Sequence, residues 1–179
     1  MLSILTILNM TQYHYLLTTI IGGMDSLARI VEKAELLVQE KNVTEQDILE
    51  ARLAPDMFPF VSQVRIATDD ARRNLFLLAG KEHVKMEDNE TTLAMLKDRI
   101  TTTKNLLLTL SQQDFEGADD RKISLFWMQG AYVLGRDFIN VYPVQNTYFH
   151  IITAYNIVRH LGGSIGKMDY IGGFPMMHE

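Results

Sequence analysis

Apolar residues recur at alternating intervals of three and four positions in four separate segments of the chain. The first segment contains Leu16, Ile20, Gly23, Leu27, Ile30, Ala34 and Leu37. A strand repeats every two residues, whereas a helix places residues at this spacing on one face. The pattern therefore predicts a long helix that ends near Glu40. A short helix over residues 45–53 is expected next, because Thr44 and Asp47 resemble a capping box.

Three later segments repeat the same spacing and predict three more long helices. One covers residues 57–79: Pro55 interrupts the chain before it, and Gly80 provides a stop after it. Another begins around residues 88–90, whose negative charge suits a helix N-terminus. The last runs from Pro143 to Gly162 or Gly163. Their apolar stripes are Phe60, Val64, Ala67, Ala71, Leu75 and Leu78; Leu93, Leu96, Ile100, Thr103, Leu107 and Leu110; and Thr147, Ile151, Ala154, Val158 and Leu161.

Helices with a single apolar stripe bury it against one another, so the pattern predicts an all-α four-helix bundle. The segment 80–87 is short, and we expect the second and third long helices to be antiparallel neighbours. The connection 111–142 is long for a structureless loop. Its segments 121–128 and 131–134 predict a small β-hairpin, and a connection that crosses the bundle argues against simple up-down-up-down wiring. Residues 164–173 are expected to be extended.

The 179 residues fit one domain, which we place at residues 10–173. One hypothesis takes Met10 as the natural start, which makes residues 1–9 either an unstructured or a mis-annotated extension. Residues 174–179 are expected to be a frayed tail. The first 24 residues lack Asp, Glu, Lys and Arg. They also lack the basic region of a signal peptide and the unbroken apolar run of a membrane span.

Charge and cysteine content exclude several classes of function. The formal net charge is −5 and the sequence pI is about 5.5, so a nucleic-acid-binding protein is not expected. The absence of cysteine excludes disulfides, thiolate nucleophiles and cysteine-ligated metal sites. This composition is consistent with a cytoplasmic protein that has no membrane partner.

The candidate chemistry lies on the fourth long helix, where Asn146 and His150 are one turn apart. At about 100° per residue they lie roughly 40° apart, at the edge of the apolar stripe. The corresponding edge of the second long helix carries Gln63, Asp70 and Asn74, with Asp56 on the same edge at the start of this helix or just before it. His150 is the best general acid or base in the chain, because its ordinary pKa is near neutrality. The alternative is a purely structural role, in which His150 is a core histidine that hydrogen-bonds to the amides of Gln63 and Asn146.

The donor set is poor for a metal ion, because transition metals favour imidazole, thiolate and carboxylate ligands. One histidine and two neutral amides supply one strong ligand and no charge. A tightly bound transition metal is therefore not expected. If a metal were bound, its ligands would be Gln63, Asn146 and His150.

Four blocks of the chain resemble a known family. Residues 51–74, 87–100, 146–163 and 166–172 read ARLAPDMFPFVSQVRIATDDARRN, EDNETTLAMLKDRI, NTYFHIITAYNIVRHLGG and GKMDYIG. They are similar to the domain of unknown function 1993, a family in the DinB/YfiT-like superfamily of four-helix bundles, many of which are described as metalloenzymes. The resemblance implies a bundle with unusual connectivity that assembles as a homodimer, and it does not imply DNA binding.

Metal-binding members of that superfamily use one histidine from the second helix and a His-x-x-x-His pair on the fourth. Alignment places Gln63, Asn146 and His150 at these three positions, so amides replace two of the three imidazoles. We therefore expect a DinB-like bundle with a small polar pocket between the second and fourth long helices. The alternative is a metal- or thiol-cofactor-dependent transferase or isomerase that uses His150 as a ligand or acid/base. A third possibility is a non-enzymatic protein whose site has become a core cluster.

Overall fold

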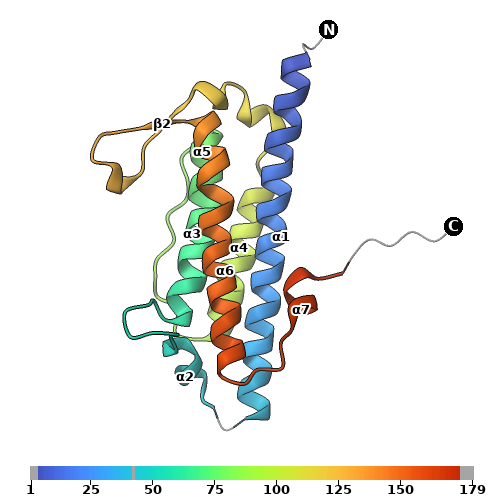
Figure 1. Cartoon of the computed structure of the whole chain (residues 1–179), viewed down its shortest axis with the longest axis vertical. Coiled ribbons are helices and arrows are strands. Elements are labelled where there is room, and N and C mark those ends of the chain that lie inside the picture. Colours follow the sequence, from blue (N-terminus) through green and yellow to red (C-terminus); the bar gives the residue numbers. More distant parts are fainter. Residues whose placement is uncertain (1–3, 42, 174–179) are drawn as a thin grey trace, which may run out of the picture.

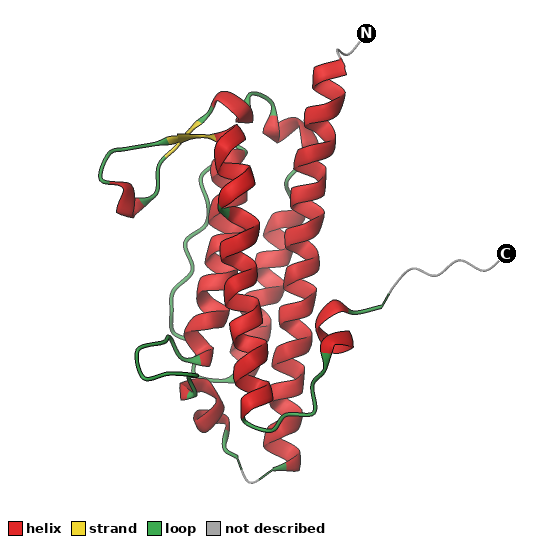
Figure 2. Ribbon diagram, viewed as in Figure 1, coloured by secondary structure: helices red, strands yellow, loops and turns green. Residues whose placement is uncertain are grey.

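Four long helices run side by side in the computed structural model, which describes residues 4–41 and 43–173, with side chains from Gln12 onward (Figure 1). The long helices are α1 (Ile4–Glu40), α3 (Phe60–Leu78), α4 (Leu93–Leu108) and α6 (Pro143–His160). The short elements that connect them (Figure 2) are the helices α2 (Glu45–Glu50) and α5 (Gly135–Val141), the 3₁₀ helices η1 (Gln112–Phe115), η2 (Ala118–Asp120) and η3 (Phe126–Met128), and the strands β1 (Lys122–Ile123) and β2 (Val133–Leu134). Helix α7 (Lys167–Ile171) follows α6.

The helix boundaries follow local capping. The predicted capping box starts α2: the Asp47 N–H donates to Thr44 Oγ1 at 3.1 Å, and the Thr44 N–H donates to Asp47 Oδ2 at 2.9 Å. This helix ends at Glu50, three residues earlier than predicted. The prediction that the third long helix starts at residues 88–90 was wrong. Helix α4 begins later, with Thr92 as the N-cap, and the Thr92 side chain accepts a hydrogen bond from the Met95 N–H. The acidic Glu90 does not cap the helix because it binds Arg99.

The wiring of the bundle differs from the expected antiparallel pairing of α3 and α4. The segment 79–92 runs back along the bundle, so α4 starts at the end where α3 starts and the two helices are parallel (Figure 1). Fourteen extended residues span roughly 46 Å, which exceeds the roughly 28 Å length of a helix of 19 residues. The segment is therefore long enough to be a full crossover. The connectivity is non-sequential, as the sequence predicts, but the crossover is the segment 79–92 and not the connection 111–142 from which it was predicted.

Around the bundle, α6 packs against α1 and α3, and α4 packs against the same two helices. Helices α1 and α6 run in one direction and α3 and α4 in the other, so the α3–α6 contact is antiparallel (Figure 1). The connection 109–142 lies across the end of the bundle where α4 ends and α6 begins. None of the described helices is both long enough and apolar enough to span a membrane.

The connection 109–142 contains the predicted hairpin, three short 3₁₀ helices and one α-helix, none of these helices being predicted. Strands β1 and β2 pair antiparallel, with Lys122 opposite Leu134 and Ile123 opposite Val133, although each strand has only two residues. Helix α5 follows at once. It begins at Gly135, where a Cβ atom would lie 1.9 Å from the Ala118 carbonyl oxygen, so only glycine allows this approach.

The segment after α6 is not extended as predicted, because part of it forms α7. The Arg29 Nε–H donates to the Asp169 carbonyl at 2.7 Å and Lys33 pairs with the Asp169 carboxylate at 3.1 Å, which holds α7 against α1. The expected frayed tail, 174–179, lies outside the described residues. Residues 4–9 are not unstructured as predicted, because α1 begins at Ile4 and includes them.

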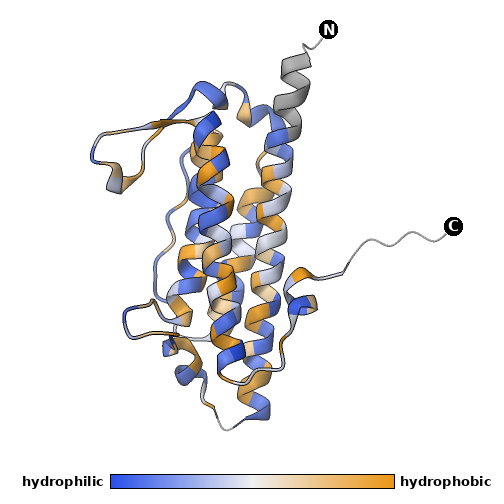
Figure 3. Cartoon of the chain, in the orientation of Figure 1, coloured by the Kyte–Doolittle hydropathy of each residue, from blue (hydrophilic) through white to orange (hydrophobic). Residues whose placement is uncertain are grey.

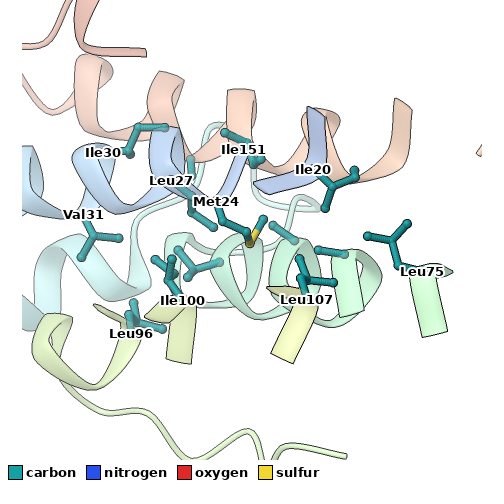
Figure 4. Packing of buried hydrophobic residues seen from close by; sticks show 14 of the residues in the cluster. Ile20, Met24, Leu27, Ile30, Val31, Leu75, Leu96, Ile100, Leu107 and Ile151 are labelled. Carbon is teal, nitrogen blue, oxygen red and sulfur yellow. The ribbon is translucent and has the colours of Figure 1, made fainter. Parts of the chain in front are cut away.

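The predicted apolar stripes form the core. Every stripe residue is buried except Leu161, which is partly exposed at the end of α6. In Figure 3, apolar and polar residues alternate along the long helices, as expected for helices that bury one side. In the close-up of Figure 4, Met24 and Leu27 of α1 lie among Ile100 and Leu107 of α4 and Ile151 of α6. The periodicity therefore identified the interior correctly.

A buried ionic network, absent from the sequence predictions, attaches the crossover 79–92 to α3 and α4. The Arg99 side chain is 1% exposed and donates to Glu90 at 2.7 Å and to Asp69 at 2.6 Å. It also donates to the Thr68 hydroxyl at 2.8 Å and to the Glu87 carbonyl at 2.9 Å. The guanidinium thus uses its planar set of donors to join two helices and the crossover.

Replacing Arg99 by Met should lower the free energy of unfolding by about 2–3 kcal/mol, because the buried Glu90 carboxylate then keeps only its 2.7 Å pair with Arg65 and the Thr68 hydroxyl loses its donor. The matched control is Arg136→Met, since Arg136 pairs with Asp120 on the exposed surface. This control should change stability by at most about 1 kcal/mol. Urea denaturation of both variants measures the difference, and equal losses would contradict a special role for Arg99.

Candidate functional site

The candidate site lies where α3 packs antiparallel against α6. Gln63 of α3 is 2% exposed and His150 of α6 is 8% exposed. The His150 Nδ1 atom lies 2.8 Å from Gln63 Oε1, and the Gln63 Nε2–H donates to the Phe58 carbonyl oxygen at 2.9 Å. The two residues that the sequence analysis placed on facing edges are thus in direct contact.

Asn146, the third predicted residue, has a different partner. Its Nδ2–H donates to an Asp70 carboxylate oxygen, and the other oxygen of that carboxylate accepts from Arg73. The structure therefore brings Gln63 and His150 together. Asn146, one turn before His150 on α6, pairs instead with Asp70. We call Gln63, Asp70 and Asn74 of α3 with Asn146 and His150 of α6 the polar cluster.

The members of the polar cluster share one side of each helix. Gln63, Asp70 and Asn74 are seven and four residues apart, a spacing that keeps them on the edge of α3 that faces α6. Asp70 was noted on this edge from the sequence, but its pairing with Asn146 was not predicted. The heptad spacing from Gln63 is the signal that could have indicated it, because both residues had to face the same neighbouring helix.

Burial controls the electrostatics of the cluster. It lowers the pKa of His150 to about 4, so the imidazole is neutral at pH 7. Burial also raises the pKa of Asp70, while Arg73 and the hydrogen bond from Asn146 act in the opposite direction. The pKa of Tyr142, at the N-terminal end of α6, is raised by burial and by the Asp70 carboxylate. The site thus contains a neutral imidazole beside a paired carboxylate.

Two fully buried polar side chains, Asn74 within the polar cluster and Thr147 beside it on α6, retain unused hydrogen-bonding capacity. Neither carboxamide atom of Asn74 has a hydrogen-bond partner among the described residues, and the same holds for the Thr147 hydroxyl. Buried polar groups normally have partners. The α3–α6 interface is therefore more polar than the packing of a bundle core requires.

Aromatic side chains lie beside the cluster on the outer side. The Phe149 ring meets the His150 ring edge to face, with centroids 5.2 Å apart, and the Phe149 side chain is 59% exposed. Trp127 of the hairpin contacts Tyr142 with ring centroids 6.2 Å apart. The imidazole is consequently adjacent to exposed aromatic surface.

The residues present do not fit a transition-metal site. Each amide atom of Gln63 already has one protein hydrogen-bond partner, and the Asp70 carboxylate is paired with Arg73 and Asn146. Within the described part of the chain, no three His, Cys, Asp or Glu residues are grouped to hold a metal ion. His150 is thus the one strong donor in the cluster, and one neutral nitrogen is a poor site for zinc.

Comparisons with known proteins agree with the fold. The family model described as "Domain of unknown function (DUF1993)" matches residues 12–171. A solved structure, the crystal structure of a DinB family member protein from Shewanella denitrificans, is 35% identical in sequence with a TM-score of 0.91. The match covers 97% of this chain and 99% of that chain, so this chain has a DinB-like fold. The comparison with curated proteins gave no match.

The depressed pKa of His150 makes a prediction about pH and stability. The unfolded chain binds a proton at His150 near pH 6.5, whereas the folded chain binds it near pH 4. The contribution of the neutral His150 side chain to the free energy of unfolding is therefore complete above about pH 6.5 and is lost as the pH falls toward 4. Between pH 7 and pH 5 the loss should be roughly 1–2 kcal/mol, reduced from the full linkage value because the ring keeps some contact with water.

Urea denaturation at several pH values tests this prediction when the native protein is compared with His150→Gln, which cannot titrate in this range. The difference in free energy of unfolding between the two proteins should shrink as the pH falls. A difference that is constant from pH 7 to pH 5, or a His150 pKa near 6.5 by NMR titration, would contradict it.

Proposed function

The chain belongs to the family of the domain of unknown function 1993, and we propose that its polar cluster binds a small molecule through the neutral imidazole of His150, without a tightly bound metal ion. One observation carries the proposal. The Nδ1 atom of His150 is held by Gln63, while the Nε2 atom takes part in no hydrogen bond among the described residues. An oriented imidazole with one unused nitrogen is suited to contact a ligand.

The surrounding residues support a ligand of limited polarity. Asp70 is already paired with Arg73 and Asn146, so the cluster offers little uncompensated charge. Phe149 provides exposed aromatic surface next to the imidazole. Binding sites for small molecules commonly combine apolar walls with a few oriented polar groups.

A transferase or isomerase that uses His150 as a general base is the second candidate, and the same unused Nε2 atom favours it. A pKa of about 4 leaves the imidazole unprotonated at neutral pH. It can then accept a hydrogen bond or a proton but cannot serve as a general acid. The rate of such an enzyme should be limited by the weak basicity of this group.

Replacing His150 by Ala should abolish binding of small molecules at this site while the fold is retained. A panel of uncharged and charged small molecules can be screened by NMR through the His150 ring and Asn146 side-chain signals. The control is His160→Ala, because His160 is exposed on the same helix. If His150 served only the core, its variant would lose about 1–3 kcal/mol of stability, and no compound in the panel would shift the native signals.

The poor donor set makes a second prediction, concerning zinc. Protein purified without a metal-affinity tag should contain no stoichiometric transition metal by elemental analysis. The double variant Gln63→His/Asn146→His should gain Zn²⁺ binding, measured as an increase in the melting temperature on addition of Zn²⁺, because three imidazoles then flank the site. Gln145→His, on an exposed position of α6, is the control. Stoichiometric zinc in the native protein would overturn the metal-free proposal.

A further inference from the structure

We infer that Gln63 holds His150 in the Nδ1–H tautomer, so that the Nε2 lone pair accepts a hydrogen bond from uncharged donors such as phenols and alcohols rather than from anions. The ligand class rests on the function proposed above, whereas the tautomer follows from the contacts of the ligand-free protein. Gln63 is thus a positioning residue that acts through His150.

The orientation of the Gln63 amide is determined by the backbone before α3. Its Nε2–H donates to the Phe58 carbonyl oxygen at 2.9 Å. The reversed amide would place Oε1 against that carbonyl, and two acceptors cannot form a hydrogen bond. The Phe60 N–H donates to the Ala51 carbonyl at 2.9 Å, which closes this connection between α2 and α3. The backbone therefore leaves Gln63 Oε1 as the atom that faces His150.

The tautomer of His150 follows from this orientation. Gln63 Oε1 can only accept, so the 2.8 Å contact requires His150 Nδ1 to carry the hydrogen. A neutral imidazole has one N–H group, and burial keeps His150 neutral at pH 7. The Nε2 atom then carries a lone pair and no hydrogen. A protein amide thereby performs the orienting role that a second hydrogen-bond partner plays for many functional histidines.

The lone pair restricts the class of ligand. A carboxylate or phosphate ester dianion has acceptors only and would meet an acceptor, whereas a hydroxyl group can donate. The Phe149 ring, edge-on to the imidazole with centroids 5.2 Å apart and 59% exposed, adds aromatic surface beside the acceptor. Aromatic pairs in such arrangements are favourable. A phenol combines the donor and the ring that this pair of side chains can contact.

Long-range ¹H–¹⁵N NMR of the ligand-free protein tests the tautomer directly, with the signals assigned from the His150→Ala variant. We expect a protonated, pyrrole-type Nδ1 and an unprotonated, pyridine-type Nε2. Gln63→Leu should release the tautomer and give a mixture, and Gln63→Met provides a second apolar replacement if the first does not fold. Gln145→Leu, which removes an exposed amide bonded to the Asn140 carbonyl, should leave the spectrum unchanged. An Nε2–H tautomer in the native protein would overturn the inference.

Titration with phenol and with benzoate tests the ligand class on the same signals. Phenol should shift the Nε2 resonance and benzoate should not, and the affinity for phenol should fall about tenfold in Gln63→Leu, the loss expected for one hydrogen bond. A response to benzoate alone would overturn the ligand class. An Nδ1–H tautomer together with no response to either compound would reject the ligand-binding site while supporting the role of Gln63, so the two failures are distinguishable.

Discussion

The antiparallel packing of α3 against α6 is the contact on which the candidate chemistry depends. Each helix contributes an apolar stripe to the core and polar residues along one edge of that stripe. When the stripes are buried, the polar edges lose water and must find partners across the interface. The Gln63–His150 and Asp70–Asn146 hydrogen bonds are the result. The packing of α3 against α6 therefore both stabilises the fold and orients the His150 imidazole.

The position of α3 depends in turn on the crossover 79–92. This segment makes α3 and α4 parallel, and Arg99 binds it to both helices through Asp69, Glu90 and the Thr68 hydroxyl. A buried guanidinium without these partners would be strongly destabilising. The network thus favours this wiring over one with a short antiparallel connection. The polar cluster and the ionic network lie on different faces of α3, so their contributions can be measured separately.

The polar cluster differs from a metal centre because its amides form hydrogen bonds with buried polar groups but supply no negative charge. Gln63 donates one hydrogen bond to the Phe58 carbonyl and accepts one from His150, and the charge of Asp70 is compensated by Arg73. A cation would therefore meet one lone pair and no free carboxylate. The same arrangement suits a neutral ligand, since the acceptor on His150 is fixed in place and is not surrounded by competing charge.

Sequence periodicity by itself determined the long helices, their buried faces and the positions of Gln63 and His150 at the edges of those faces, because a regular helix converts spacing into direction. That these two edges share one site was implied by the family resemblance. The four quoted blocks also indicated the family to which the chain belongs. Helix α7, the parallel course of α3 and α4, and the partners of Asn146 and Arg99 were decided only by the tertiary structure. The length of a loop limits the distance that it can span but does not determine its direction. The partner of a long polar side chain depends on which neighbouring groups lie within reach, and these come together only when the helices pack.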